Sequence, residues 1–261
     1  MRRKLAGLRV LVTGASQGLG RAIAEAAAKR GAKVLAVSRT PQPLAGIETL
    51  AADITKPADR AAMVEAATRL FGGLDVLINN AGIGATGHFV DSSPDTLRAV
   101  FETNFFGTTE MIRAFLPTLK KGVTPAIVNI SSVVGKRAIP GMPSYSASKF
   151  AVNGFSEAVR AELAKDGVDV IVVNPGLTRT NFGKNLAEAK TPPLDDTKGM
   201  SAEDAAEAVL RALERGASDT TLTFRGKLLV LASRYTPRLV EFFFKRRVRR
   251  EYADEIAARQ R

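Results

Sequence analysis

Residues 8–20 decide the fold and read Leu8-Arg9-Val10-Leu11-Val12-Thr13-Gly14-Ala15-Ser16-Gln17-Gly18-Leu19-Gly20. The first six residues are rich in aliphatic side chains and predict a buried strand. A glycine loop follows, and an alanine-rich amphipathic sequence then continues to about Arg30, which predicts a helix. Glycines let the backbone approach a pyrophosphate, and free amides at the start of the helix favour its negative charge. The spacing Gly-x-x-x-Gly-x-Gly departs from the commonest dinucleotide fingerprint, so its meaning depends on the surrounding sequence.

Strand and helix patterns alternate through the rest of the chain. Further strands are predicted at residues 33–37, 47–52, 75–79, 126–130, 169–173 and 220–224, and helices at residues 59–70, 95–106 and 144–165. This alternation predicts an α/β fold, in which a doubly wound parallel sheet is covered by helices on both faces and binds ligands at the carboxyl ends of its strands. A chain of 261 residues fits a single domain with one core.

Two strand ends carry groups that suit a nucleotide. The second strand ends at Ser38-Arg39, where a NAD-binding domain commonly has an acidic residue that holds the ribose hydroxyls. A hydroxyl and a guanidinium suit a 2′-phosphate instead, because Arg binds phosphate through two parallel hydrogen bonds. A solvated loop arginine is the alternative. Asp53 and Ile54 follow the third strand, where Asp53 is placed either to reach an adenine edge or to cap the next helix.

A second stretch, Ser144-Tyr145-Ser146-Ala147-Ser148-Lys149, places a phenol and an ammonium four residues apart on one helix face. Pro143 and Ser144 signal the start of this helix, Ser144 as its side-chain cap. A cation held beside a phenol favours the phenolate, so Lys149 could tune Tyr145 for acid–base work on a carbonyl or an alcohol. The alternative is an ordinary amphipathic helix on which the two side chains merely pair.

Small and polar residues also follow other strands of the predicted sheet. They are Asn80-Ala81-Gly82, Ser131-Ser132 and Asn174-Pro175-Gly176. One residue breaks a local rule, because Asn104 lies inside a predicted helix, where its amide competes with backbone hydrogen bonding. Exceptions of this kind tend to mark function or strain.

The composition excludes several other kinds of site. The chain has no cysteine, which excludes disulfides, thiolate zinc sites and thiol nucleophiles. His88 is the only histidine, so we expect no metal, and we interpret this histidine as structural or as the edge of a substrate pocket. No apolar run is long enough to cross a membrane, and the N-terminus lacks the apolar segment of a signal peptide. We therefore expect a cytoplasmic protein.

Together these residues resemble the short-chain dehydrogenase/reductase (SDR) family. The shared motifs occur in family order within residues 5–215 and are Thr13-Gly14-x-x-x-Gly18-x-Gly20, Asp53, Asn79-Asn80-Ala81-Gly82, Asn104, Ser132, Tyr145-x-x-x-Lys149 and Pro175-Gly176. The resemblance implies a Rossmann-type fold and an enzyme that transfers hydride between a nicotinamide cofactor and a carbonyl or alcohol carbon.

The resemblance also implies a role for each residue. Tyr145 is the expected acid/base, Lys149 lowers its pKa and holds the nicotinamide ribose, and Ser132 hydrogen-bonds the substrate oxygen. Asn104 is expected to hold a water that connects Lys149 to solvent. The spacing of thirteen positions to Tyr145 favours Ser132 over Ser131. The expected cofactor is NADP(H), held by Gly14, Ser16, Gln17, Gly18, Leu19, Gly20, Arg39, Asp53, Ile54, Asn80, Ala81, Gly82, Tyr145, Lys149, Pro175, Gly176, Thr178 and Thr180.

The C-terminal segment departs from the common ending of the family. The net charge of the chain is +12, and residues 225–261 hold eleven Lys/Arg against four Asp/Glu. We expect residues 1–225 to form the NADP-binding Rossmann catalytic domain, and residues 226–261 to form a basic amphipathic helical extension of the same domain. An apolar cluster beside a basic one favours peripheral contact with a membrane. The alternative is packing against the core or a dimer partner. Nucleic acid is not an expected partner.

The sequence therefore predicts an NADP-dependent oxidoreductase that acts on an apolar, lipid- or steroid-like carbonyl or alcohol. The resemblance implies a homodimer or homotetramer formed by the long helices around Asn104 and Tyr145. One alternative is a non-catalytic NADP-sensing or scaffolding protein that uses the basic tail. Another is an epimerase or dehydratase on the related extended scaffold, for whose substrate domain the chain has little room. Residues 85–89 and 181–199 are expected to form the rim of the substrate pocket and a mobile lid.

Overall fold

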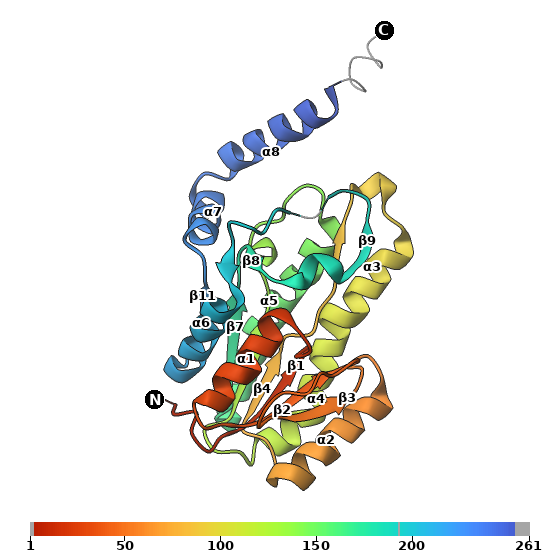
Figure 1. Cartoon of the computed structure of the whole chain (residues 1–261). Coiled ribbons are helices and arrows are strands. Elements are labelled where there is room, and N and C mark those ends of the chain that lie inside the picture. Colours follow the sequence, from red (N-terminus) through yellow and green to blue (C-terminus); the bar gives the residue numbers. More distant parts are fainter. Residues whose placement is uncertain (1–2, 193, 254–261) are drawn as a thin grey trace.

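A seven-stranded parallel sheet forms the centre of the computed structural model, which describes residues 3–192 and 194–253 (Figure 1). The strand order is β11-β7-β6-β4-β1-β2-β3, and all neighbouring strands are parallel. The strands are β1 (Arg9–Thr13), β2 (Lys33–Ser38), β3 (Glu48–Ala51), β4 (Val76–Asn79), β6 (Ala126–Ile130), β7 (Asp169–Asn174) and β11 (Asp219–Thr221). The predicted parallel sheet is confirmed.

Helices cover both faces of this sheet. One face is covered by α1 (Gly18–Lys29) and α6 (Ala202–Arg215), and the other by α2 (Pro57–Phe71), α4 (Thr108–Leu119) and α5 (Pro143–Leu163). Val10 and Val12 of β1 belong to the first core and Leu11 to the second, because successive side chains of a strand point to opposite faces. Burying one such side chain stabilises the fold by about 1.5–3 kcal/mol. The predicted doubly wound architecture is also confirmed.

The order of the strands reverses between β1 and β4. From β1 the chain proceeds outward through β2 and β3, and it then returns to place β4 on the other side of β1. The loops after β1 and β4 leave in opposite directions, and the crevice between them is where open α/β sheets bind ligands.

The helix predicted at residues 95–106 is longer and changes its pitch. α3 (Pro94–Phe101) continues through a π-helical turn, η2 (Glu102–Gly107), directly into α4, so the prediction ended this helix too early. Asn104 lies in the π-helical turn, and its side chain bonds the backbone of Ile83. Because the amide finds partners outside the helix, it does not break the helix, and π-helical turns recur at functional sites.

Strand β11 ends earlier than the predicted strand at residues 220–224. The Thr223 hydroxyl accepts a hydrogen bond from the Gly226 amide at 3.1 Å and caps α7 (Phe224–Tyr235). Threonine is a preferred N-cap, since its oxygen pairs one of the free amides of the first turn. Phe224 therefore starts a helix instead of ending a strand.

The predicted lid at residues 181–199 contains secondary structure. Within it, β9 (Leu186–Ala189) pairs with β5 (Gly84–Thr86), and β8 (Thr178–Arg179) and β10 (Met200–Ser201), which pair with each other, flank the lid. The first pairing joins the lid to the predicted rim of the pocket. Pro193 lies outside the described residues, and the mobility of the lid stays a prediction. Short helical turns complete the chain at η1 (Phe89–Asp91), η3 (Val133–Gly135), η4 (Ala164–Asp166) and η5 (Asn181–Lys184).

The C-terminal extension is helical, as predicted. α8 (Pro237–Glu251) follows α7 and extends beyond the layers of the sheet in Figure 1. Across residues 3–192 and 194–253, every helix is too short or too polar to span a bilayer. Residues 254–261 of the predicted extension, and residues 1–2 of the predicted catalytic domain, lie outside the described part of the chain. The division of the chain at residue 225 stays a prediction.

A buried ion pair joins the amino-terminal ends of neighbouring strands in the sheet. Asp75 accepts hydrogen bonds from the backbone amide, Nε and Nη2 of Arg9 at 2.8, 2.9 and 2.6 Å. It also accepts one from the Val123 amide at 2.6 Å, so a single carboxylate joins β1, β4 and the turn before β6. Burial raises the pKa of Asp75, but these hydrogen bonds and the charge of Arg9 outweigh burial and lower it overall.

Asp75→Asn is expected to lower the free energy of unfolding by about 3 kcal/mol at neutral pH, because Arg9 loses its anionic partner. A carboxyl whose pKa is lowered by folding stabilises the protein above its unfolded pKa, and this contribution is lost as pH falls through the folded value. The difference between wild type and variant should therefore shrink below about pH 4. Urea unfolding of both proteins across this pH range measures the difference in their free energies of unfolding. A difference that does not vary with pH contradicts the prediction.

Candidate active site

The glycine loop after β1 packs against the segment that follows β4. The Thr13 hydroxyl accepts hydrogen bonds from the amides of Asn80 and Ala81, both at 3.0 Å. The Asn80 side chain donates to the carbonyls of Thr13 and Gly14 at 3.0 and 3.2 Å. Gly14 has a φ of +66°, and a Cβ there would lie 2.7 Å from Ala81 Cα. Any other residue at this position would push the two segments apart.

The same loop presents the start of α1 to the crevice. Gln17 is the N-cap of α1 and makes no capping side-chain hydrogen bond, and the first turn holds no acidic residue. A Cβ at Gly20 would lie 2.3 Å from both the Gly14 carbonyl oxygen and Asn80 Nδ2, so the helix can approach the loop this closely only with glycine. The free amides and the positive end of the helix dipole fit the phosphates of a dinucleotide.

Arg39 and Asp53 lie at the ends of the neighbouring strands β2 and β3. Burial raises the pKa of Asp53, but hydrogen bonds from the Thr55 amide and hydroxyl, at 2.9 and 2.8 Å, and the charges of Arg39 and Lys56 lower it overall. Asp53 does not cap α2, whose N-cap is Lys56. The buried Ser38 hydroxyl has no hydrogen-bond partner within the described residues. This corner therefore offers a guanidinium and an unused hydroxyl.

The start of α5 places Tyr145 and Lys149 side by side. Lys149 Nζ lies 5.7 Å from the centroid of the Tyr145 ring. Pro143 occupies the first turn of the helix, as predicted. The predicted Ser144 cap is wrong, because the N-cap is Met142, which makes no capping side-chain hydrogen bond, and Ser144 is buried within the first turn.

Burial controls the ionisation of this pair. The side chains of Tyr145 and Lys149 belong to residues that are only 8% and 4% exposed. Burial raises the pKa of Tyr145, although a hydrogen bond with Ser132 opposes this, and burial lowers the pKa of Lys149 to about 8. Lys149 Nζ donates to the Ile130 carbonyl at 2.9 Å. Burial outweighs the neighbouring cation, so the phenol is not shifted toward the phenolate as the sequence suggested.

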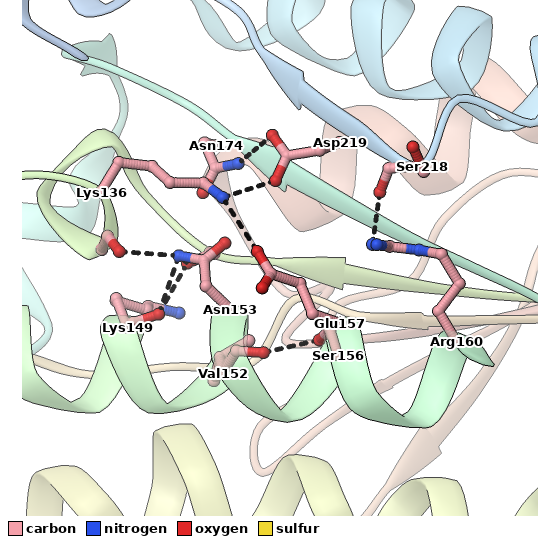
Figure 2. A network of polar contacts seen from close by, with 12 residues as sticks. Lys136, Lys149, Val152, Asn153, Ser156, Glu157, Arg160, Asn174, Ser218 and Asp219 are labelled. Atoms are coloured by element: carbon pink, nitrogen blue, oxygen red, sulfur yellow. Dashed lines mark hydrogen bonds and ion pairs between the residues drawn. The ribbon is translucent and has the colours of Figure 1, made fainter. Parts of the chain in front are cut away.

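The two serines after β6 have different surroundings. Ser132 lines the cavity and hydrogen-bonds the Tyr145 side chain. Ser131 is buried, and its hydroxyl donates to the Lys149 carbonyl at 3.1 Å and accepts from Asn153 Nδ2 at 2.9 Å. Figure 2 shows Asn153 reaching back to the Lys149 carbonyl on the same helix. Ser132 is therefore the serine beside the phenol, and its role in the reaction stays a prediction.

Asn104 lies behind the wall of the cavity. Its Oδ1 accepts a hydrogen bond from the Ile83 amide at 2.8 Å, and its Nδ2 donates to the Ile83 carbonyl at 2.9 Å and to Ser148 Oγ at 3.0 Å. A Cβ at Gly82 would lie 3.1 Å from Asn104 Oδ1 and 3.6 Å from Lys149 Nζ, so both polar atoms lie close to the backbone of Gly82. Asn104 thereby ties the start of α5 to the segment after β4, while its expected water stays a prediction.

One cavity of about 1450 Å³ connects these parts. The predicted site residues that line it are Gly14, Ser16, Gln17, Gly18, Leu19, Gly20, Arg39, Asp53, Ile54, Asn80, Ala81, Gly82, Ser132, Tyr145, Lys149, Pro175, Gly176, Thr178 and Thr180. Asn104 is the one predicted site residue outside this lining. His88 lies elsewhere, because its ring packs on Tyr252 at 4.8 Å and its Nε2 is 3.8 Å from a carboxylate oxygen of Glu251.

The cavity also has apolar walls, part of which come from the predicted lid at residues 181–199. Val134, Met142 and Tyr145 form a buried cluster, against which Ile139 and Phe182 pack. The Phe182 ring lies 5.5 Å from the Tyr145 ring. Further apolar lining comes from Leu186, Leu194, Phe224 and Leu229. Phe182, Leu186 and Leu194 belong to the predicted lid, whereas Phe224 and Leu229 of α7 carry no motif and were not predicted to line the pocket.

Known proteins resemble this chain over most of its length. A family model described as short chain dehydrogenase matches residues 9–191. Dehydrogenase/reductase SDR family member 7B of Bos taurus is 35% identical over 235 residues, which cover 82% of this chain and 72% of that protein. The 3-ketodihydrosphingosine reductase of Bacteroides thetaiotaomicron is 36% identical over 206 residues, covering 78% and 74%. A solved short chain dehydrogenase from Burkholderia cenocepacia, in complex with NADP, is 33% identical, with a TM-score of 0.81 and coverage of 93% and 99%.

The buried ammonium predicts a pH dependence of stability. When folding lowers the pKa of a lysine, charging it destabilises the folded state, and this penalty is relieved as pH rises from about 8 to 10.5. Wild type should therefore gain about 3 kcal/mol of stability relative to Lys149→Met across this range. Chemical unfolding of both ligand-free proteins at several pH values measures the gain. If the difference between the two proteins stays constant, the ammonium is not desolvated as described.

Proposed function

This chain belongs to the short-chain dehydrogenase/reductase family, whose members are NAD(P)-dependent oxidoreductases, and we propose that it uses NADPH to reduce the carbonyl group of an apolar, lipid- or steroid-like substrate. One observation carries the proposal. A phenol, an ammonium and a serine hydroxyl meet on one wall of a cavity that combines a phosphate-binding loop with apolar side chains. Reduction needs these groups together, because a proton must reach the oxygen as hydride reaches the carbon.

Tyr145 is the proposed acid. Burial raises its pKa, so the phenol keeps its proton at neutral pH and can give it to a carbonyl oxygen. Ser132, which hydrogen-bonds the phenol, would donate to the same oxygen and stabilise the negative charge that develops there. The bound nicotinamide would supply the hydride. The protonated phenol is the form that carbonyl reduction requires at the start of each turnover.

Lys149 and Asn104 complete the proposed machinery. An ammonium has three N–H donors, and among the described residues Lys149 donates one hydrogen bond, to the Ile130 carbonyl. The others would hold the nicotinamide ribose. A pKa of about 8 also allows Lys149 to exchange a proton near neutral pH, which fits the return of a proton to Tyr145 after each turnover. Asn104 would hold the water that links Lys149 to solvent.

NADP(H) is the proposed cofactor. The uncapped start of α1 fits the pyrophosphate, and Arg39 with the Ser38 hydroxyl fits the 2′-phosphate. The similar Burkholderia cenocepacia structure contains NADP. The remaining proposed contacts are Asp53 and Ile54 with adenine, Asn80 and Gly82 with ribose, and Pro175, Thr178 and Thr180 with the nicotinamide end.

An apolar substrate follows from the surroundings of Tyr145. The cluster of Val134, Met142, Ile139 and Phe182 excludes water from the phenol and offers no charged partner. Burying a polar substrate there would leave its groups without hydrogen bonds. One relative is named as a reductase of 3-ketodihydrosphingosine, which agrees with a ketone substrate for this chain.

Two further proposals concern partners. Leu239, Phe242 and Phe243 are exposed on the arginine-rich helix α8, which supports peripheral contact with an anionic membrane by an otherwise cytoplasmic protein. Leu97 and Phe106 are exposed on α3 and η2, which supports a homodimer or homotetramer formed through the helices around Asn104 and Tyr145.

Tyr145→Phe is expected to lower kcat for carbonyl reduction by at least about 100-fold, because it removes the proton donor and keeps the ring. NADPH binding should change little. Initial rates and NADPH titrations measure both, and Tyr235→Phe on the exposed face of α7 is the matched control. If Tyr145→Phe retains a rate near that of wild type, another group is the acid.

Arg39→Gln is expected to weaken NADPH binding by about 10- to 100-fold and to leave NADH binding unchanged, because only NADPH carries the 2′-phosphate. Lys56→Gln is the matched control, since Lys56 is another cation that acts on Asp53. Fluorescence titration with both reduced cofactors gives the dissociation constants. If the binding of NADPH and of NADH weakens equally, Arg39 does not recognise the 2′-phosphate.

A further inference from the structure

A second cavity lies outside the cofactor site, between the start of α5 and the C-terminal helices. It has a volume of about 1110 Å³, and we call it the α8 groove. One wall comes from residues 136–143 and Phe150, and the other from α7 and α8. Much of its lining is apolar, from Ala138, Ile139, Pro140, Pro143, Phe150, Val230, Phe244 and Val248.

The charged side chains of the α8 groove are mainly cations. They are Lys136, Arg137, Arg234, Lys245 and Arg249, with Glu241 as the single carboxylate. Both lysines have anionic partners. Figure 2 shows Lys136, whose Nζ lies 2.6 Å from Asp219 and 3.8 Å from Glu157, and Lys245 Nζ lies 2.7 Å from Glu241.

The three arginines carry the unbalanced charge. Within the part of the chain that the structure describes, no ion pair engages Arg137, Arg234 or Arg249. Glu241 is one carboxylate among five cations and lies 2.7 Å from Lys245 Nζ, so it cannot balance the three arginines. The groove therefore combines apolar walls with an excess of guanidinium groups.

Two polar atoms in the groove lack partners. Arg137 stacks on α8, with its guanidinium carbon 5.4 Å from the centroid of the Phe244 ring. Its Nε is buried and has no hydrogen-bond partner among the described residues, and the same holds for Ser233 Oγ on α7. Buried donors are nearly always paired. An acceptor bound in the groove would supply the partner that each of them lacks.

We propose that the α8 groove binds an amphiphile with one anionic headgroup, a phosphate or a carboxylate, on an alkyl chain. The headgroup lies against Arg137, Arg234 and Arg249, since guanidinium groups bind both oxyanions through paired hydrogen bonds. The alkyl chain lies along the apolar walls. The volume is far larger than an inorganic anion needs and is at the upper end for ligand pockets.

The position of the groove favours a single bound molecule over a bilayer surface. Val248 and Phe244 of α8 line the groove, whereas Leu239, Phe242 and Phe243 of the same helix are exposed. At 100° per residue, these two groups lie on opposite faces of the helix. Contact with a bilayer through the exposed face would leave the groove on the protein side of α8.

Calorimetric titration of the ligand-free protein with dodecyl phosphate, kept below its micelle concentration, tests the proposal. We expect saturable binding at one site. Inorganic phosphate supplies the headgroup alone and dodecyl maltoside supplies an uncharged amphiphile, so each should bind at least about tenfold more weakly. If either binds as tightly as dodecyl phosphate, the groove does not recognise both parts and the proposal is wrong.

Arg137→Gln and Arg249→Gln should each weaken the binding of dodecyl phosphate by about tenfold or more. Arg246→Gln is the matched control, because it removes the same charge from the exposed face of α8, and it should change the affinity less than about twofold. Equal weakening in all three variants would indicate a response to net charge alone. If Arg137→Gln fails to fold, Arg249→Gln on the exposed rim still decides the question.

Two further arms identify where the probe binds. Saturating NADPH should leave the affinity for dodecyl phosphate unchanged, and competition would place the probe in the cofactor cavity and overturn the proposal. In sedimentation with phosphatidylserine vesicles, Arg137→Gln should bind as well as wild type, because Arg137 stacks on Phe244 on the groove side of α8. A loss in Arg137→Gln that exceeds the loss in Arg246→Gln, without saturable binding of dodecyl phosphate, would assign the groove to a bilayer surface. None of these readouts requires catalysis, so they remain valid if the proposed reaction is wrong.

Discussion

The close contact between the glycine loop and the segment after β4 is the constraint on which the site depends. Four hydrogen bonds join Thr13 and Gly14 to Asn80 and Ala81 across the switch point of the sheet, and the absence of side chains at Gly14 and Gly20 lets the backbones meet. This contact aims the start of α1 at the crevice and fixes the segment of Gly82. Because Gly82 adjoins both Asn104 and Lys149, the phosphate-binding end and the proposed catalytic end share one scaffold.

Burial gives the proposed catalytic pair its character. An isolated Tyr–Lys pair on a helix surface would interact weakly through water. Here both side chains are buried, so the phenol favours its neutral form and the ammonium loses part of its preference for charge. A hydride acceptor that carries a developing negative charge would find a proton donor, a serine hydroxyl and a cation together. In the proposed reaction, the stability that the fold loses by burying the Lys149 ammonium places a cation beside the reacting groups.

The sequence predicted the layers of the fold and most of the site because those signals are local. Alternating strand and helix patterns, glycines after β1 and polar residues at strand ends each span a few positions. The anomaly at Asn104 was visible, but its partners Ile83 and Ser148 are distant in sequence and became known only from the structure. The Ser144 cap failed because Pro143 begins the helix, which makes Met142 the N-cap and places Ser144 within the first turn. The place of the lid around Phe182 was predicted, but its contact with Tyr145 and the α8 groove were not, because they depend on the packing of loops and C-terminal helices that carry no motif.

The central claim is that this chain reduces apolar carbonyl compounds with NADPH, and the most direct measurement is consumption of NADPH by the wild-type protein with ketones of increasing alkyl length. The proposed geometry predicts turnover, a rise of kcat/KM with chain length as more apolar surface is buried against the cavity wall, and a preference for NADPH over NADH. Tight NADPH binding without turnover of any ketone or aldehyde would contradict the claim and would favour a cofactor-sensing role.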